Sequence, residues 1–192
     1  GYSSCGEVIQ AGKDVKDFHV GDKVISNGGH AEYVTVNQNL CSRIPDNTSE
    51  KEAAFTVLGS IALHGLRLSE TTLGSKIVVI GLGIVGQLVC RLAEAQGSKV
   101  IGIDPDEKRI LDRKNFYTSI EDAINDKSIN SENVDSVIIT AASSSNEPIE
   151  VATRIARNKA KIVVVGDIPL NISRNDFYYK ELELVVSKSY GP

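Results

Sequence analysis

Methionine and tryptophan are absent from this chain of 192 residues, and aromatic residues make up 5% of it. Because the chain also begins with glycine, we expect an excised fragment or a sequence that omits modified methionines. The three cysteines, Cys5, Cys41 and Cys90, lie far apart and are odd in number, which excludes a disulfide framework and a CxxC metal site. We expect them to be reduced thiols in a cytoplasmic protein.

Basic blocks and long apolar runs are also missing. With 21 Lys and Arg against 25 Asp and Glu, the net charge of -4 argues against nucleic-acid and membrane-surface partners. No stretch approaches the roughly 18 apolar residues of a membrane-spanning helix, and no charged-then-apolar leader opens the chain. We therefore expect a cytoplasmic protein whose partner is a small-molecule substrate.

The segment 76–90 runs from an apolar strand through three spaced glycines into a helical pattern, which is a dinucleotide-binding fingerprint in its required context. Gly81 permits the tight turn, Gly83 lets the backbone approach a pyrophosphate, and Gly86 lets the helix pack closely on the strand. The phosphates are expected at the helix N-terminus. The predicted cofactor-binding residues of this loop are Gly81, Leu82, Gly83, Ile84, Val85 and Gly86.

A second apolar strand, 99–104, ends in Asp104, 18 residues beyond Gly86. An acid at this point can accept hydrogen bonds from the adenosine ribose diol and repels a 2'-phosphate, which favours NAD(H). Lys108 and Arg109 follow closely and offer a phosphate another partner, so NADP(H) stays open. Arg109 is included among the predicted cofactor-binding residues.

The remaining pattern divides into two parts. Short β-type runs with glycine punctuation over residues 1–45 predict a small antiparallel module, and Ser49 with Glu52 predicts the capped start of a helix that reaches Leu68. From about residue 69 strands and helices alternate, which predicts a doubly wound parallel sheet. The predicted strands are 6–10, 21–26, 31–36, 76–80, 99–104, a short one near 116–117, 134–140, 161–166 and 181–187. The core face of the helix after Gly83 is predicted from Ile84, Val85, Leu88, Val89, Leu92 and Ala93, and Pro148 opens a helix that runs through Arg157.

Several motifs together resemble the medium-chain dehydrogenase/reductase superfamily. They are Gly6-Glu-Val-Ile, Val20-Gly-Asp-Lys-Val24, Ala31-Glu-Tyr-Val34 and Leu63-His64-Gly65, followed by the glycine fingerprint. The resemblance implies an α/β fold in which part of a GroES-like antiparallel β domain with its linking helix (1–66) precedes a Rossmann domain (67–192). It also implies that the start of the β domain and its C-terminal return are missing, and that a homodimer forms through the last strand of the Rossmann sheet. By the same likeness, Ala141, Ala142 and Ser143 lie beside the cofactor, and Gly166 and Asp167 near its nicotinamide end.

The metal ligands of the zinc-dependent members have no counterpart here. Tyr2 and Ser3 stand where those members have a Gly-His-Glu motif, Val57 stands near a later ligand position, and only 25–30 replaces the lobe with four cysteines. None of these side chains is a credible zinc ligand, so we expect no metal. The tail, residues 166–192, resembles the dehydrogenase half of bi-domain oxidoreductases from surface-polysaccharide gene neighbourhoods, which implies a role in polysaccharide biosynthesis.

Without zinc, a hydroxyl or an imidazole must stabilise the oxyanion that develops during hydride transfer. Tyr2 and Ser3 are the candidate catalytic residues, with His64 and Tyr190 as weaker ones. The favoured hypothesis is a zinc-independent, NAD(H)-dependent oxidoreductase module that transfers a hydride to or from a small, sugar-like alcohol or ketone. An NADPH-dependent quinone or enone reductase and a non-catalytic dinucleotide sensor domain are the alternatives.

Overall fold

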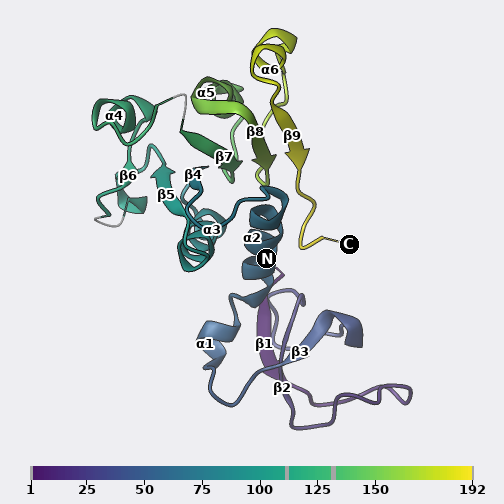
Figure 1. Ribbon diagram of the computed structural model, residues 1–192. Helices are drawn as coiled ribbons and strands as arrows, with labels where there is room; N and C mark the ends of the chain where they lie inside the picture. The colour runs from purple at the N-terminus through teal and green to yellow at the C-terminus, as the bar shows by residue number, and fades with distance from the viewer. Residues whose placement is uncertain (1, 111–112, 131–132, 192) are drawn as a thin grey trace. The chain divides into compact units, whose positions relative to one another are not determined.

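The computed structural model describes residues 2–110, 113–130 and 133–191 (Figure 1). By its packing the chain divides into two compact units, Gly1–Ser60 and Ile61–Pro192. The predicted domain boundary at 66/67 falls in the same helix as this division, α2 (Thr56–Leu68). The segment compared above with zinc-dependent enzymes begins at Gly1, and the tail compared with bi-domain enzymes ends at Pro192. These two residues lie outside the described residues.

The first unit contains a small antiparallel sheet of three strands in the order β1-β2-β3. Its strands are β1 (Ser4–Glu7), β2 (Lys23–Ser26) and β3 (Cys41–Arg43), and a 3-10 turn, η1 (Gln38–Leu40), precedes β3. The predicted antiparallel module is therefore confirmed, but the strand predicted at 31–36 is wrong. Alternation of apolar and polar residues shows that a segment can form a strand, but it does not say whether the segment finds a neighbour to pair with. The segment that pairs with β2 is β3, not residues 31–36.

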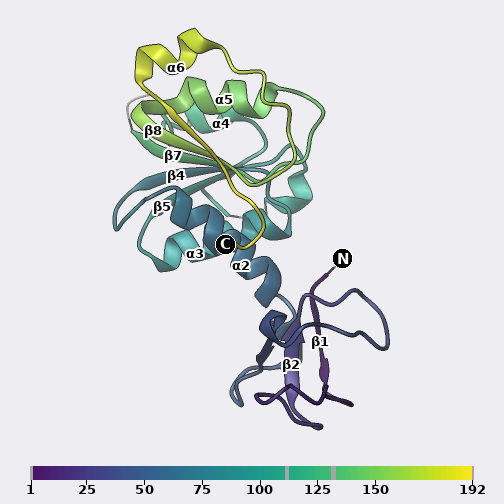
Figure 2. The same ribbon diagram turned by 90° about the vertical axis from the view of Figure 1, so that its right-hand side faces the viewer.

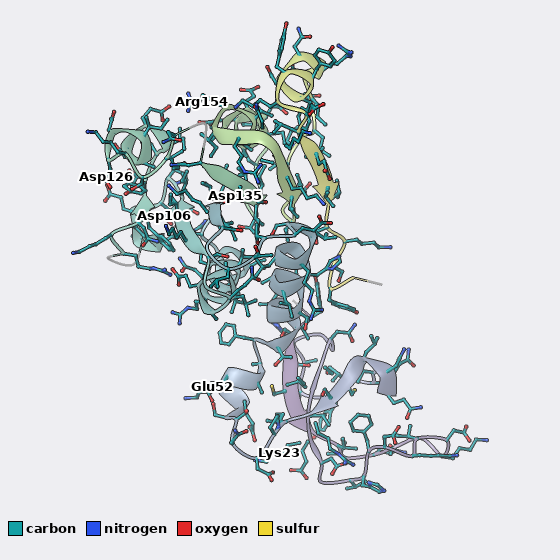
Figure 3. The ribbon with its side chains drawn as sticks, viewed as in Figure 1. Lys23, Glu52, Asp106, Asp126, Asp135 and Arg154 are labelled. Carbon is teal, nitrogen blue, oxygen red and sulfur yellow. The ribbon has the colours of Figure 1, made fainter. Side chains whose placement is uncertain are left out.

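The helix predicted to begin at Ser49 is present but interrupted. Ser49 Oγ accepts a hydrogen bond from the Glu52 amide at 3.3 Å, and the Glu52 carboxylate accepts one from the Ser49 amide at 3.0 Å, which confirms the capping box of α1 (Glu50–Ala53). Figure 3 shows Glu52 on this short helix. α1 ends at Ala53, a turn in which the Ala54 amide donates to the Glu50 carbonyl at 2.9 Å follows, and α2 begins at Thr56.

The second unit is built on a sheet of six parallel strands in the order β6-β5-β4-β7-β8-β9, which confirms the predicted doubly wound sheet. The strands are β4 (Lys76–Ile80), β5 (Lys99–Ile103), β6 (Phe116–Tyr117), β7 (Val134–Ile139), β8 (Ala156–Val164) and β9 (Glu183–Val186). The short strand near 116–117 is confirmed, and β8 begins five residues before the prediction.

Helices cover both faces of this sheet (Figure 2). One face carries α4 (Ile120–Asn125), α5 (Glu147–Ile155) and α6 (Arg174–Lys180), and the other carries α2 and α3 (Ile84–Ala95). Successive residues of β4 alternate between the two cores, with Val78 in one and Ile77 and Val79 in the other, all fully buried. This two-sided burial is why the central strands are continuous apolar runs.

The core face of α3 agrees with the prediction except at its first residue. Val89 and Ala93 are fully buried, but Ile84 is 56% exposed. The glycine loop, rather than an apolar side chain, packs under the first turn of α3, because Gly86 is the buried residue there. Ile84 is therefore removed from the predicted core.

Candidate functional site

Four loops of the second unit meet at the carboxyl edge of the parallel sheet. Backbone hydrogen bonds join the residues that follow β4, β7 and β8 to the last residues of neighbouring strands. These contacts are Gly81 N to Ile103 O (2.8 Å), Ala141 N to Ile80 O (3.1 Å) and Gly166 N to Ile139 O (3.0 Å). The strand order reverses between β4 and β7, and ligands of open α/β sheets bind outside the carboxyl ends of the strands at such a point.

The glycine turn after β4 has no room for side chains at two of its positions. Gly81 has a φ of +95°, and a Cβ there would lie 2.5 Å from the Ala141 nitrogen. A Cβ on Gly86 would overlap the Gly81 carbonyl oxygen. Thr140, at the end of β7, donates its hydroxyl to that same carbonyl at 2.5 Å. We did not predict this contact, since the sequence signal is only a hydroxyl residue at a strand end.

Gly83, by contrast, faces open space. A Cβ on Gly83 would meet no atom within 4 Å, and as the N-cap of α3 it has no side chain to accept from the first amides of the helix. Those amides need partners, and the N-terminus of a helix favours negative charge. Two crowded glycines flanking an open one therefore fit a pyrophosphate laid across the start of a 12-residue helix.

Asp104 follows β5 and is only 3% exposed. Its Oδ2 accepts a hydrogen bond from the Leu82 amide at 2.7 Å, and its Oδ1 accepts one from the Asp106 amide at 2.9 Å. Arg109 places Nη1 3.1 Å from the same Oδ2 and Nε 3.4 Å from Asp106 (Figure 3 labels Asp106). Asp104, the acid predicted to bind the ribose, thus lies against the glycine loop. Arg109, the cation predicted as a phosphate partner, is paired with the carboxylates of Asp104 and Asp106.

The predicted cofactor residues after β7 and β8 are also brought together. The Ser143 amide donates to the Asp167 carbonyl at 2.9 Å, and a Cβ on Gly166 would overlap the Ala141 carbonyl oxygen. Ala142 and Asp167 are exposed at this edge. The loops are therefore tied to each other beside the glycine turn.

The four candidate proton donors divide between the two units. Tyr2 is half exposed, and Ser3 donates its hydroxyl to the Ala54 carbonyl at 2.5 Å within the first unit. In the second unit the tail returns to α2, where Gly191 (φ +93°) packs on the His64 ring so closely that a Cβ would lie 3.0 Å from two ring atoms. Tyr190 precedes this contact and is 40% exposed.

Within residues 2–110, 113–130 and 133–191, no three His, Cys, Asp or Glu side chains gather closely enough to hold a metal ion. In the same ranges, no helix has both the length and the apolar character needed to cross a membrane.

Comparison with known proteins matches both units. The alcohol dehydrogenase GroES-like domain matches residues 1–46, and the TrkA-N domain matches residues 77–174. The chain belongs to the medium-chain dehydrogenase/reductase superfamily. Its GroES-like and Rossmann parts are the two units described above.

Relatives of this medium-chain dehydrogenase/reductase chain include D-guloside 3-dehydrogenase of Escherichia coli, 38% identical over 104 residues, which are 52% of this chain and 30% of the relative. The 2-dehydro-3-deoxy-L-galactonate 5-dehydrogenase of Pseudoalteromonas atlantica is 24% identical over 235 residues, covering 99% of this chain and 67% of the relative.

Solved structures share the fold. Galactitol-1-phosphate dehydrogenase from Escherichia coli superimposes with a TM-score of 0.80 at 20% identity, over 96% of this chain and 66% of that one. A putative zinc-binding dehydrogenase from Sinorhizobium meliloti, bound to NADP, has a TM-score of 0.81 at 24% identity, over 95% and 66%. This chain therefore spans between about a quarter and two thirds of the proteins it matches.

Proposed function

We propose that the protein containing this chain is a dehydrogenase that transfers a hydride between a nicotinamide dinucleotide and a small alcohol or ketone of sugar-like character. The observation that carries the proposal is the glycine turn, with Gly83 open at the start of α3 and Asp104 beside it. In this proposal the α3 amides hold the pyrophosphate and Asp104 holds the adenosine ribose. The nicotinamide supplies or accepts the hydride when the cofactor is bound.

NAD(H) is the favoured cofactor. A buried carboxylate at the end of β5 opposes a 2'-phosphate, and Arg109 is already paired with Asp104 and Asp106. In the same proposal Ala141 to Ser143, after β7, lie beside the cofactor, and Gly166 and Asp167, after β8, lie near its nicotinamide end. Their position at the same sheet edge as the glycine turn supports these roles.

The substrate class rests on the relatives. They include a D-guloside 3-dehydrogenase, an (R,R)-butanediol dehydrogenase and a D-xylulose reductase, whose names specify a sugar glycoside, a diol and a ketose. A sugar or sugar derivative is therefore the proposed substrate, and a surface polysaccharide is the proposed destination of its product.

Catalysis without zinc is also proposed. Tyr2 and Ser3 stand where zinc-dependent members carry a ligand motif, and the alignment with the Pseudoalteromonas relative spans 235 positions against 192 residues here. That relative therefore carries segments without a counterpart in this chain. The hydroxyls of Tyr2 and Ser3 are the proposed donors to the substrate oxygen.

Two further properties belong to the proposal. We place the protein in the cytoplasm, and we expect a homodimer through β9, the strand at one edge of the six-stranded sheet. The domain boundary at 66/67 also stays a prediction.

An NADPH-dependent quinone or enone reductase is the second candidate. Arg109 favours it, because its side chain is half exposed and lies beside the predicted ribose site, where a 2'-phosphate would draw it away from Asp104. A dinucleotide-binding sensor without turnover is the third. NADH binding with no redox activity in the full-length protein would support it.

Calorimetric titration with NADH and NADPH tests the proposal. The wild-type chain is expected to bind NADH more tightly than NADPH. Asp104→Asn is expected to raise the dissociation constant for NADH about tenfold, which is the effect of losing a hydrogen bond to a charged group. Asp176→Asn, an exposed aspartate on α6, is the matched control and should change neither affinity. Failure of the folded wild-type chain to bind either dinucleotide would refute the proposed site, whereas a preference for NADPH would favour the reductase.

A further inference from the structure

The side chain of Gln87, on the first turn of α3, bridges the two loops that frame the adenosine end of the proposed site. Its Nε2 lies 2.9 Å from the Arg109 carbonyl oxygen and 3.4 Å from the Leu82 carbonyl oxygen. Leu82 belongs to the glycine loop, and Arg109 ends the 3-10 turn η2 (Glu107–Arg109) after β5. One carboxamide therefore connects the phosphate loop to the turn that carries the cation.

These contacts close a ring. The Leu82 amide donates to Asp104, Asp104 pairs with the Arg109 guanidinium, the Arg109 carbonyl accepts from Gln87, and Gln87 reaches back to the Leu82 carbonyl. The backbone of Arg109 is thus held by Gln87 while its side chain is held by Asp104 and Asp106. A turn fixed in this way keeps the guanidinium on the carboxylates.

The other carboxamide atom shows that this arrangement has a cost. Gln87 Oε1 is buried and has no hydrogen-bond partner among the described residues. A buried acceptor without a partner is unfavourable, so Oε1 by itself would favour an apolar side chain of similar shape at this position. The contacts of Nε2 are what glutamine gains in return. Those contacts act on the loop and the turn of the adenosine site.

We propose that Gln87 is a positioning residue that sets cofactor selectivity by anchoring η2, so that Arg109 stays paired with Asp104 and is withheld from a 2'-phosphate. The inference rests on the proposed function, because it assumes that a dinucleotide binds at the glycine loop. When the anchor is removed, η2 gains freedom, and the guanidinium can leave Asp104 for the phosphate of NADPH. Selectivity then shifts toward NADPH although no group that touches the cofactor has changed.

Gln87→Met tests this inference, because methionine keeps the unbranched shape and helix propensity of glutamine while removing both the donor and the orphaned oxygen. We expect the ratio of the NADPH to the NADH dissociation constant, measured by calorimetry, to fall about fivefold, the scale of one lost net hydrogen bond. Gln96→Met is the matched control. It makes the same change at the far end of α3, where Gln96 donates to the Thr71 carbonyl at 2.8 Å, and the ratio should stay unchanged.

The outcomes separate the two proposals. If the wild-type chain binds neither dinucleotide, the proposed function fails. If the wild-type chain prefers NADH and Gln87→Met has the same ratio of dissociation constants as wild type, the positioning role of Gln87 is refuted. The same holds if Gln87→Met weakens the binding of both cofactors equally. A similar shift in Gln96→Met would also refute it, since the effect would then not come from η2. Far-ultraviolet circular dichroism checks that each variant is folded, and Gln87→Leu serves as the replacement if Gln87→Met is not.

Discussion

Lys180 caps the end of a helix to which it does not belong. It is the last residue of α6, and its Nζ lies 2.9 Å from each of three carbonyl oxygens, those of Thr153, Arg154 and Ala156, at the C-terminal end of α5. The last carbonyls of a helix lack partners inside the helix, and a cation there also complements the helix dipole. Burial lowers the pKa of Lys180, so part of the gain from these bonds is offset by desolvation.

The expected effect of Lys180→Met follows from these contacts. A hydrogen bond to a charged group contributes about 1.5–3 kcal/mol, and three bonds that share one partly buried charge are far from additive. Water can also reach some of the carbonyls after substitution. We therefore expect a loss of about 2–3 kcal/mol in the free energy of unfolding, since methionine retains most of the apolar stem of lysine and removes only the charged donor.

Urea unfolding followed by circular dichroism measures this loss in the transition of the second unit. Lys159→Met is the matched control in the same unit, because Lys159 makes an exposed ion pair with Glu181 at 3.3 Å and such pairs contribute about 0–1 kcal/mol. If Lys180→Met costs no more than Lys159→Met, water replaces the lysine fully and the capping argument is wrong.

Two more predictions concern groups with shifted pKa values. Burial raises the pKa of Cys90 to about 12. A thiol reagent at about pH 8 should therefore label Cys5 and Cys41 in the folded chain but Cys90 only after denaturation, which mass spectrometry can count. Equal labelling rates at the three cysteines would contradict the burial of Cys90. Burial alone would raise the pKa of Asp135, but the Lys76 amide and the Arg157 guanidinium outweigh it and lower the pKa. The stability contributed by Asp135 is therefore present above its unfolded pKa of about 4 and is lost as pH falls through the lower folded value, so wild type and Asp135→Asn should differ most at neutral pH and converge in acid. A difference that persists unchanged at low pH would contradict this.

The glycine turn and Asp104 were predictable because their requirements are local. Gly81 needs a positive φ and Gly86 a close approach, and both follow from the spacing of glycines between a strand and a helix. Asp104 ends an apolar run, so its place at a strand end follows from the run itself. The parallel direction of the strands, with helices on both faces, was predictable from the alternation of strands and helices along the chain, since crossovers in parallel sheets have one hand.

Other contacts depend on residues that the sequence keeps far apart. Thr140 reaches Gly81 and Lys180 reaches Thr153 only because neighbouring strands and helices place them together. The third strand of the first unit was predicted wrongly because alternation within 31–36 says nothing about which segment pairs with β2.

The amino-acid pattern thus specified the Rossmann fold, the glycine turn after β4 and the acid at the end of β5, because burial and backbone strain act over a few neighbouring residues. Pairing between distant segments was settled by packing. The Gln87 anchor is the clearest case, since a half-buried glutamine on a helix has no distinctive sequence signal until the fold brings η2 against it and leaves its other oxygen without a partner among the described residues. Tertiary packing alone could pair the Gln87 carboxamide with the Arg109 carbonyl, because β5, which η2 follows, must first pack beside α3.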